Sequence, residues 1–212
     1  RPRTWLIGGG TLLTVGCLAA LWYGGLKWYF VPKRWETVDD GAVYRSAEVT
    51  PHMLKQTWLD HHIKAVVVLG RDKEGHANED NELRVAAELG IDRQLFDLDG
   101  KGLGDPQSYI GAMEALIQAR RDGKAVVIHC AKGVYRTGGL VATYRLLLKG
   151  WSGTRAYDEM IAHRIEPDSP LIPFLNQNMP RIAASLASAG YIDRVPDPMP
   201  VLAPTGRDAR AN

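Results

Sequence analysis

The feature of this sequence that most constrains its fold is the alternation of short β-branched runs with helical segments. The runs are "IKAVVVLG" (63–70), "IDRQLFDLD" (91–99) and "KAVVIHC" (124–130). Each has the length and composition of a strand. Thr50-Pro51 and Asp105-Pro106 each place a capping residue before a proline, which is typical of a helix start. This alternation predicts an α/β fold, with a mostly parallel central sheet flanked by helices.

Composition limits the partners and cofactors that the chain can use. The 212 residues are 45% hydrophobic and carry a formal net charge of +2, which suits one sizeable core. Because the basic residues form no long run, we expect no nucleic-acid partner. Cys17 and Cys130 are the only cysteines, which excludes a disulfide framework and a structural zinc site. No histidine has metal-ligand spacing with a carboxylate or thiolate, so no metal is expected.

An uncharged apolar run occupies residues 5–26, "WLIGGGTLLTVGCLAALWYGGL". It is long enough for one transmembrane helix, and tryptophan, tyrosine and basic residues flank it as they flank membrane spans. A cleaved secretory signal and a buried core helix are the alternatives. The run predicts a single-pass N-terminal membrane anchor and connector over residues 1–35.

The remaining boundaries depend on the anchor and on the C-terminal composition. Four prolines among the last 18 residues predict a flexible tail over 195–212, which leaves residues 36–194 as the folded domain. Basic residues lie on both sides of the apolar run, so their count does not fix the orientation. An uncleaved N-terminal anchor commonly exports the domain that comes after it, which favours an extracytoplasmic domain.

The stretch "HCAKGVYRTG" (129–138) carries the strongest chemical signal. A strand ending at Cys130 and a helix starting beyond it place this loop at the carboxyl edge of a parallel sheet, where such sheets bind ligands. Successive backbone N–H groups and the helix N-terminus suit a phosphate and favour a thiolate at Cys130. Gly133 permits the tight turn, Arg136 can grip two phosphate oxygens, and Thr137 places a hydroxyl near the sulfur. The alternative is an inert, buried thiol.

The same stretch resembles the His-Cys-five-residues-Arg-Ser/Thr signature of the cysteine-dependent protein tyrosine and dual-specificity phosphatases. Upstream, "VYRSAEVTPHMLKQTWLDHHIKAVVVLGRD" resembles the opening strand, helix and strand of their compact, atypical bacterial-type group, so the resemblance covers residues 40–190. It implies a two-step reaction without cofactor or metal, in which Cys130 forms a phosphocysteine that water hydrolyses. It also implies support from His129 and Thr137, and phosphate binding by Ala131, Lys132, Gly133, Val134, Tyr135 and Arg136.

A phosphatase of this kind needs an acid that protonates the leaving oxygen. Asp99 begins "DGKGLGDP" and precedes Cys130 by 31 residues, similar to the usual spacing in dual-specificity phosphatases. Asp105 precedes Cys130 by 25 residues, a position from which some compact bacterial relatives take their acid, but it would also cap a helix. Asp97 lies inside a predicted strand. We therefore expect Asp99 or Asp105, with Asp97 the weakest candidate.

The loop composition also bears on the substrate. Relatives that act on phosphoinositides or inositol polyphosphates often carry two or more basic residues in the loop, whereas Lys132 is the only one between Cys130 and Arg136 here. This favours phosphotyrosine, and then phosphoserine or phosphothreonine, in proteins. An alternative substrate is a membrane phospholipid or inositol phosphate bound by the same loop, which the predicted membrane anchor favours. A further alternative is a tethered pseudophosphatase that binds phosphate groups without hydrolysing them.

Overall fold

The computed structural model describes residues 15–17, 20–22, 27–71 and 77–205. Within these parts the strands are β1 (Glu36–Asp39), β2 (Val43–Ala47), β3 (Ile63–Leu69), β4 (Asp92–Phe96) and β5 (Ala125–Cys130). The helices are α2 (Lys27–Phe30), α3 (Pro51–Asp60), α4 (Ala77–Leu89), α5 (Pro106–Arg121), α6 (Tyr135–Leu147), α7 (Gly153–Ala162) and α8 (Leu171–Ser188).

The five strands form one mixed sheet in the order β1-β2-β5-β3-β4. Strand β1 is antiparallel to β2, and the other neighbouring pairs are parallel. Strand β5 therefore lies at the centre, and its last residue, Cys130, pairs with Ala47 of β2. The carboxyl ends of four parallel strands thus meet at one edge of the sheet, and Cys130 lies at that edge.

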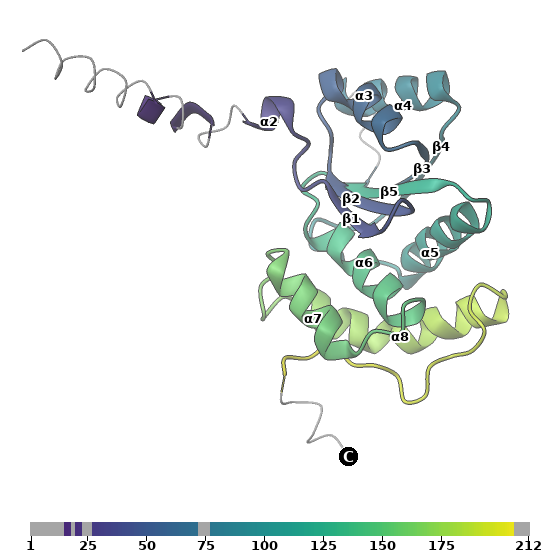
Figure 1. The fold of residues 1–212 in the computed structure, drawn as a ribbon. Coiled ribbons are helices and arrows are strands. Elements are labelled where there is room, and N and C mark those ends of the chain that lie inside the picture. Colours follow the sequence, from purple (N-terminus) through teal and green to yellow (C-terminus); the bar gives the residue numbers. More distant parts are fainter. Residues whose placement is uncertain (1–14, 18–19, 23–26, 72–76, 206–212) are drawn as a thin grey trace, which may run out of the picture.

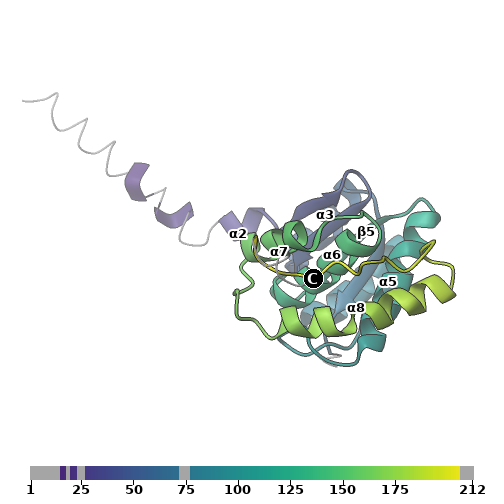
Figure 2. The ribbon, with the colours of Figure 1, turned by 90° about the horizontal axis from the view of Figure 1, so that it is seen from below.

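Helices cover both faces of the sheet (Figure 1). Helices α3 and α4 lie on one face and α5 and α6 on the other, while α7 and α8 form a further layer outside α5 and α6 (Figure 1). Figure 2 shows the molecule from the side of this outer layer. All six residues of β5 are buried. Because successive strand residues face opposite sides, Val126 and Ile128 join the core cluster under α5 and α6, and Val127 joins the cluster under α3 and α4.

Local sequence signals account for the helix that precedes the central strand. The carboxylate of Asp105 accepts a hydrogen bond from the Gln107 N–H at 2.9 Å, and Pro106 occupies the first helical position of α5. The helix start predicted at Asp105-Pro106 is therefore confirmed. The start predicted at Thr50-Pro51 is confirmed by α3, although the Thr50 side chain makes no capping hydrogen bond.

All three predicted strands are present, and two of them have boundaries close to those predicted. Strands β3 and β5 correspond to the runs 63–70 and 124–130. Strand β4 ends at Phe96, so Asp97 lies beyond the strand and not inside it as predicted. Neither β1 nor α4 was predicted from the sequence. Helix α4 continues a polar, acidic stretch, and such a stretch is typical of a loop.

The predicted transmembrane helix over residues 5–26 is contradicted. In the part of the chain that the structure describes, no helix is long and apolar enough to cross a membrane. A span needs about 20 consecutive apolar residues in one helix, and of the predicted run only 15–17 and 20–22 are described; the rest of it lies outside the described residues. The membrane localisation and the extracytoplasmic placement, which depended on this helix, are withdrawn with it.

The segment predicted as a flexible tail is described as far as residue 205. Leu202 is buried, and its backbone N–H and carbonyl pair with the side-chain amide of Asn176 on α8 at 2.8 and 3.0 Å. The Val201 carbonyl lies so close to Gly153 that a Cβ there would approach it to 1.7 Å. Residues 206–212 lie outside the described part.

Replacing Asn176 with alanine should release this segment, because both hydrogen bonds to Leu202 are lost. We expect the free energy of unfolding in urea to fall by about 1–3 kcal/mol. Backbone amide exchange over residues 195–205 should become faster in the same variant. Asn178→Ala is the matched control, since the Asn178 amide bonds to Phe174 within its own helix. Equal protection of 195–205 in both variants would contradict the anchoring role.

Candidate active site

The loop between β5 and α6 lies where the sequence predicts it. Strand β5 ends at Cys130, helix α6 begins at Tyr135, and residues 131–134 cross the carboxyl edge of the sheet between them. Val134 is buried, whereas Ala131 and Lys132 are exposed. The loop is therefore short, and its two ends are fixed by the central strand and by a helix that is almost entirely buried.

The environment of Cys130 favours the thiolate. The side chain is buried, and the Gly133 N–H donates a hydrogen bond to Sγ at 3.2 Å. Burial raises the pKa of the Cys130 thiol, but Thr137, the charge of Arg136 and the Gly133 N–H together lower it below its usual value. Thr137 acts on the sulfur through both its hydroxyl and its backbone N–H, although among the described residues the buried hydroxyl forms no well-aligned hydrogen bond.

Two arginines hold the loop from outside. Buried Arg45 on β2 donates to the Gly133 carbonyl at 3.2 Å, and Arg34 donates to the Lys132 carbonyl at 2.7 Å. Gly133 itself has a φ of 64°, and a Cβ there would lie 2.6 Å from backbone atoms of Ser46 and Ala47. Only glycine fits this position. With the carbonyls of Lys132 and Gly133 held by the arginines, the Gly133 N–H points at the sulfur.

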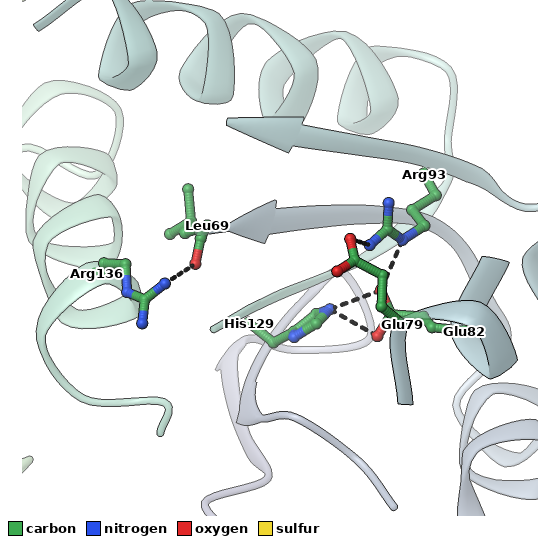
Figure 3. A network of polar contacts seen from close by, with 6 residues as sticks. All are labelled: Leu69, Glu79, Glu82, Arg93, His129 and Arg136. Carbon is green, nitrogen blue, oxygen red and sulfur yellow. Dashed lines mark hydrogen bonds and ion pairs between the residues drawn. The ribbon is translucent and has the colours of Figure 1, made fainter. Parts of the chain in front are cut away.

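Arg136 lies beside the end of β3. Its Nη1 donates to the Leu69 carbonyl at 3.0 Å (Figure 3), and a Cβ on Gly70 would lie 2.7 Å from the same nitrogen. The guanidinium borders a cavity of about 60 Å³ that Cys130 also lines, and a second hollow of about 190 Å³ beside Asp99. One N–H of the fork is used by Leu69, and the fork has further donors.

The three candidate acids occupy different environments. Asp99 is partly buried at the hollow beside Arg136, and its Oδ1 accepts hydrogen bonds from the N–H groups of Lys101 and Leu103, both at 2.8 Å. Asp105 is exposed and caps α5. Asp97 is also exposed and forms a surface ion pair with Arg71. Of the three, Asp99 alone borders a hollow that Arg136 also lines.

A buried tyrosine fixes the loop that carries Asp99. Tyr109 on α5 is fully buried, and its hydroxyl donates to the Gly102 carbonyl at 2.8 Å. A Cβ on Gly139 of α6 would lie 2.4 Å from that hydroxyl oxygen. Burial and the nearby charges of Asp99 and Cys130 raise the pKa of Tyr109, so the hydroxyl stays protonated as a donor.

Tyr135 connects the mouth of the site to two other segments. Its hydroxyl is hydrogen-bonded to the carboxylate of Glu166, and Lys101 Nζ donates to the hydroxyl oxygen at 3.3 Å. Lys101 Nζ also lies 4.5 Å from the centroid of the ring. Exposed pairs of this kind add little stability. Their main effect is to connect the Asp99 loop, through Tyr135, to the segment between α7 and α8.

His129 belongs to a buried ionic network on the other side of the sheet (Figure 3). Its Nε2 lies 3.2 and 3.1 Å from the two carboxylate oxygens of Glu82 on α4. Arg93 on β4 donates to Glu82 at 2.7 Å and to Glu79 at 3.2 Å. Sequence reasoning missed Glu79, Glu82 and Arg93. The available signal was the helical spacing of Glu82 with the buried residues Val85 and Ala86.

Within the residues that the structure describes, no group of three or more histidine, cysteine, aspartate or glutamate side chains could hold a metal ion. The polar groups that act directly on the Cys130 sulfur are N–H donors, a hydroxyl and a guanidinium. Such a set is suited to binding an oxyanion.

Comparison with known proteins shows the fold. No family model matches the chain, and no curated protein matches it. The core catalytic domain of the PP-IP phosphatase Siw14 from S. cerevisiae matches with a TM-score of 0.59 and 20% identity, over 76% of this chain and 94% of that chain. PTPMT1 matches with a TM-score of 0.58 and 20% identity, over 73% of this chain and 99% of that chain. TpbA from P. aeruginosa matches with a TM-score of 0.56 and 20% identity, over 74% of this chain and 98% of that chain. The chain therefore has the same α/β fold as these three proteins.

Replacing Gly133 with alanine should disturb the loop more than backbone strain alone explains. The left-handed conformation costs a non-glycine residue about 1–2 kcal/mol, and the Cβ would also collide with β2. We expect a larger loss of unfolding free energy in urea. Alkylation of Cys130 at neutral pH should become slower, because the Gly133 N–H moves away from the sulfur.

The matched control for that variant is Gly41→Ala. Gly41 has a φ of 61°, but no atom lies within 4 Å of the added Cβ. It should lose only the energy of the backbone strain and keep the wild-type alkylation rate. Indistinguishable unfolding energies and alkylation rates for the two variants would show that the close approach to β2 has no effect.

Proposed function

We propose that the chain is a cysteine-dependent phosphomonoesterase whose catalytic residues lie in the domain predicted over residues 36–194. The observation that carries this proposal is the environment of Cys130, a buried thiol with a lowered pKa beneath a loop that directs an N–H at the sulfur. Arg136 lies six residues further and borders the same cavity. An inert thiol in a core would need none of these groups.

In the first step the Cys130 thiolate attacks the phosphorus of the substrate. An S–P bond forms as the ester P–O bond breaks, and the leaving oxygen takes a proton from the acid. The loop N–H groups and the guanidinium of Arg136 bind the non-bridging phosphate oxygens, on which charge is spread in the transition state. The planar fork of Arg136 can bind two oxygens at once.

In the second step water attacks the phosphorus of the phosphocysteine. The carboxylate that gave up its proton accepts one from this water, the S–P bond breaks, and inorganic phosphate and the Cys130 thiolate are released. Thr137 is beside the sulfur, so its hydroxyl can stabilise the thiolate as it leaves. No metal or cofactor takes part in either step.

We assign the acid to Asp99. Its Oδ1 holds the turn through Lys101 and Leu103, which leaves Oδ2 for the proton. Asp99 also borders the hollow that Arg136 lines, whereas Asp105 is committed to capping α5. Tyr109 supports the assignment, because its hydrogen bond to Gly102 holds the Asp99 loop near α6.

For the substrate we propose phosphotyrosine in proteins, since Lys132 is the only basic residue among the five between Cys130 and Arg136. A second candidate is an inositol phosphate or phosphoinositide. It is favoured by the fold shared with the PP-IP phosphatase Siw14 and with PTPMT1, which has been solved in complex with PI(5)P. A panel of phosphotyrosine peptide, phosphoserine peptide, dispersed PI(5)P and an inositol pyrophosphate, compared by kcat/KM, distinguishes these classes.

Cys130→Ser should abolish hydrolysis of every substrate in that panel while vanadate still binds, because the hydroxyl is a poor nucleophile and the anion site is retained. Wild-type turnover should be unaffected by EDTA and lost on treatment with iodoacetamide. Cys17→Ser is the control and should keep full activity. A Cys130→Ser protein that still turns over, or a wild-type enzyme inhibited by EDTA, would end the cysteine mechanism.

Asp99→Asn should lower kcat for a phosphotyrosine peptide at least tenfold, because proton transfer typically contributes about 10²–10⁴ in rate. Asparagine can still accept the two backbone hydrogen bonds, so the turn should remain. The loss should be smaller for an ester with a more acidic leaving group, and the high-pH limb of kcat should disappear.

Asp105→Asn is the matched variant for this test. Asparagine caps helices about as well as aspartate, so both stability and the pH profile should stay near wild type. If Asp105→Asn loses the high-pH limb and Asp99→Asn keeps it, the acid is Asp105. If neither variant changes the profile, the acid lies outside this loop.

A further inference from the structure

The network around His129 joins three elements of the fold. Glu79 and Glu82 come from α4, Arg93 from β4, and His129 from β5 (Figure 3). Glu82 is 4% exposed and His129 6% exposed. A buried ion is unfavourable unless it is paired and hydrogen-bonded, so each of these groups depends on its neighbours for its charge.

The charges within the network favour a protonated imidazole. Burial alone would lower the pKa of His129, but the charge and the hydrogen bond of Glu82, together with Cys130, raise it above its usual value. Burial would raise the pKa of Glu82, yet His129 and Arg93 lower it to about 2. Glu82 is therefore an anion at neutral pH, and its charge favours the protonated form of the His129 ring.

His129 is also the residue next to the nucleophile. The two side chains leave β5 on opposite faces of the sheet, and both line the cavity beside Arg136. The influence of Cys130 on His129 is reciprocal, because a thiolate favours the imidazolium as much as the imidazolium favours the thiolate. Among the residues that the structure describes, the charged and titratable groups that face this cavity are Glu48, Arg71, Glu79, Glu82, Arg93, His129, Cys130 and Arg136.

We propose that Glu82 is a positioning residue that holds His129 as an imidazolium and, through it, keeps Cys130 in the thiolate form at neutral pH. Arg93 orients the carboxylate of Glu82 by donating to its Oε1 at 2.7 Å. Helix α4, which contributes no residue to the phosphate loop, thereby influences the nucleophile. The kinetic consequence of this role rests on the proposed phosphatase reaction, whereas its effect on the thiol can be measured without substrate.

The expected effect of Glu82→Gln is set by these charges. Glutamine has nearly the shape of glutamate but no charge, so burial and Arg93 then favour neutral His129. The thiolate loses a nearby cation, and the sulfur should hold its proton to higher pH. We expect the midpoint of Cys130 deprotonation to rise by about one pH unit, which is a tenfold smaller thiolate fraction in the acidic range.

The test uses the full chain with Cys17→Ser, so that Cys130 is the only thiol. The rate of alkylation by iodoacetamide is measured from pH 4 to 9 for the parent, Glu82→Gln, His129→Asn and the double variant. If Glu82 acts through His129, Glu82→Gln should shift the midpoint upward in the parent and not in the His129→Asn background. An equal shift in both backgrounds, or no shift in a folded Glu82→Gln protein, would overturn the proposal.

Glu88→Gln is the matched control on the same helix. Glu88 is exposed and pairs with Lys55 and Arg84, so its loss should leave the midpoint unchanged. A midpoint shift in Glu88→Gln as large as that in Glu82→Gln would mean that the effect is one of general charge, and would also overturn the proposal.

A second measurement does not depend on the folding of Glu82→Gln. The His129 ring resonances of the parent protein are titrated by NMR and assigned by their loss in His129→Asn. The proposal requires a protonated His129 at pH 7, and a neutral ring at that pH would refute it. Loss of phosphatase activity has no bearing on this result. If the protein hydrolyses no phosphoester but Glu82→Gln still raises the midpoint of Cys130 deprotonation, the proposed function is rejected and the role of Glu82 is retained.

Discussion

The arrangement around Cys130 depends on keeping a negative charge on a buried sulfur. Moving an anion out of water is costly, and only groups held in place by the fold can compensate. Three of these groups, Gly133, Thr137 and Arg136, come after the sulfur within seven residues and are fixed where β5 passes into α6. The central place of β5 in the sheet fixes that passage, since neighbouring strands restrain it on both sides.

The loop is also held from outside, by contacts that span long stretches of sequence. Arg45 on β2 and Arg34 before β1 bind the carbonyls of Gly133 and Lys132. Because peptide groups are planar, fixing a carbonyl also fixes the N–H on the other side of the same peptide. Residues from the start of the chain thereby help to orient the donors that face the anion site.

Much of the fold and of the loop could be predicted from local sequence, and the remainder depends on contacts between distant residues. β-branched runs and Asx-Pro or Thr-Pro starts are local signals, so β3, β5, α3 and α5 were found. Helix α4 was missed because its first turn is polar and acidic, with Glu82 in the buried stripe where an apolar residue is usual. The partners of that glutamate, Arg93 and His129, lie 11 and 47 residues further along the chain, and no local pattern relates them. The membrane helix was predicted from hydrophobicity, length and flanking aromatic and basic residues, and the described part of the chain contains no helix of that kind.

The contact of Tyr109 with Gly102 and Gly139 has a consequence for how this sequence can change over generations. The hydroxyl of Tyr109 fills the space that a side chain at position 139 would need, and it binds the backbone at position 102. A larger residue at 139 is compatible with the fold only after position 109 has lost its tyrosine. The two positions should therefore be inherited as a pair, with the change at 109 coming first in any lineage that alters both.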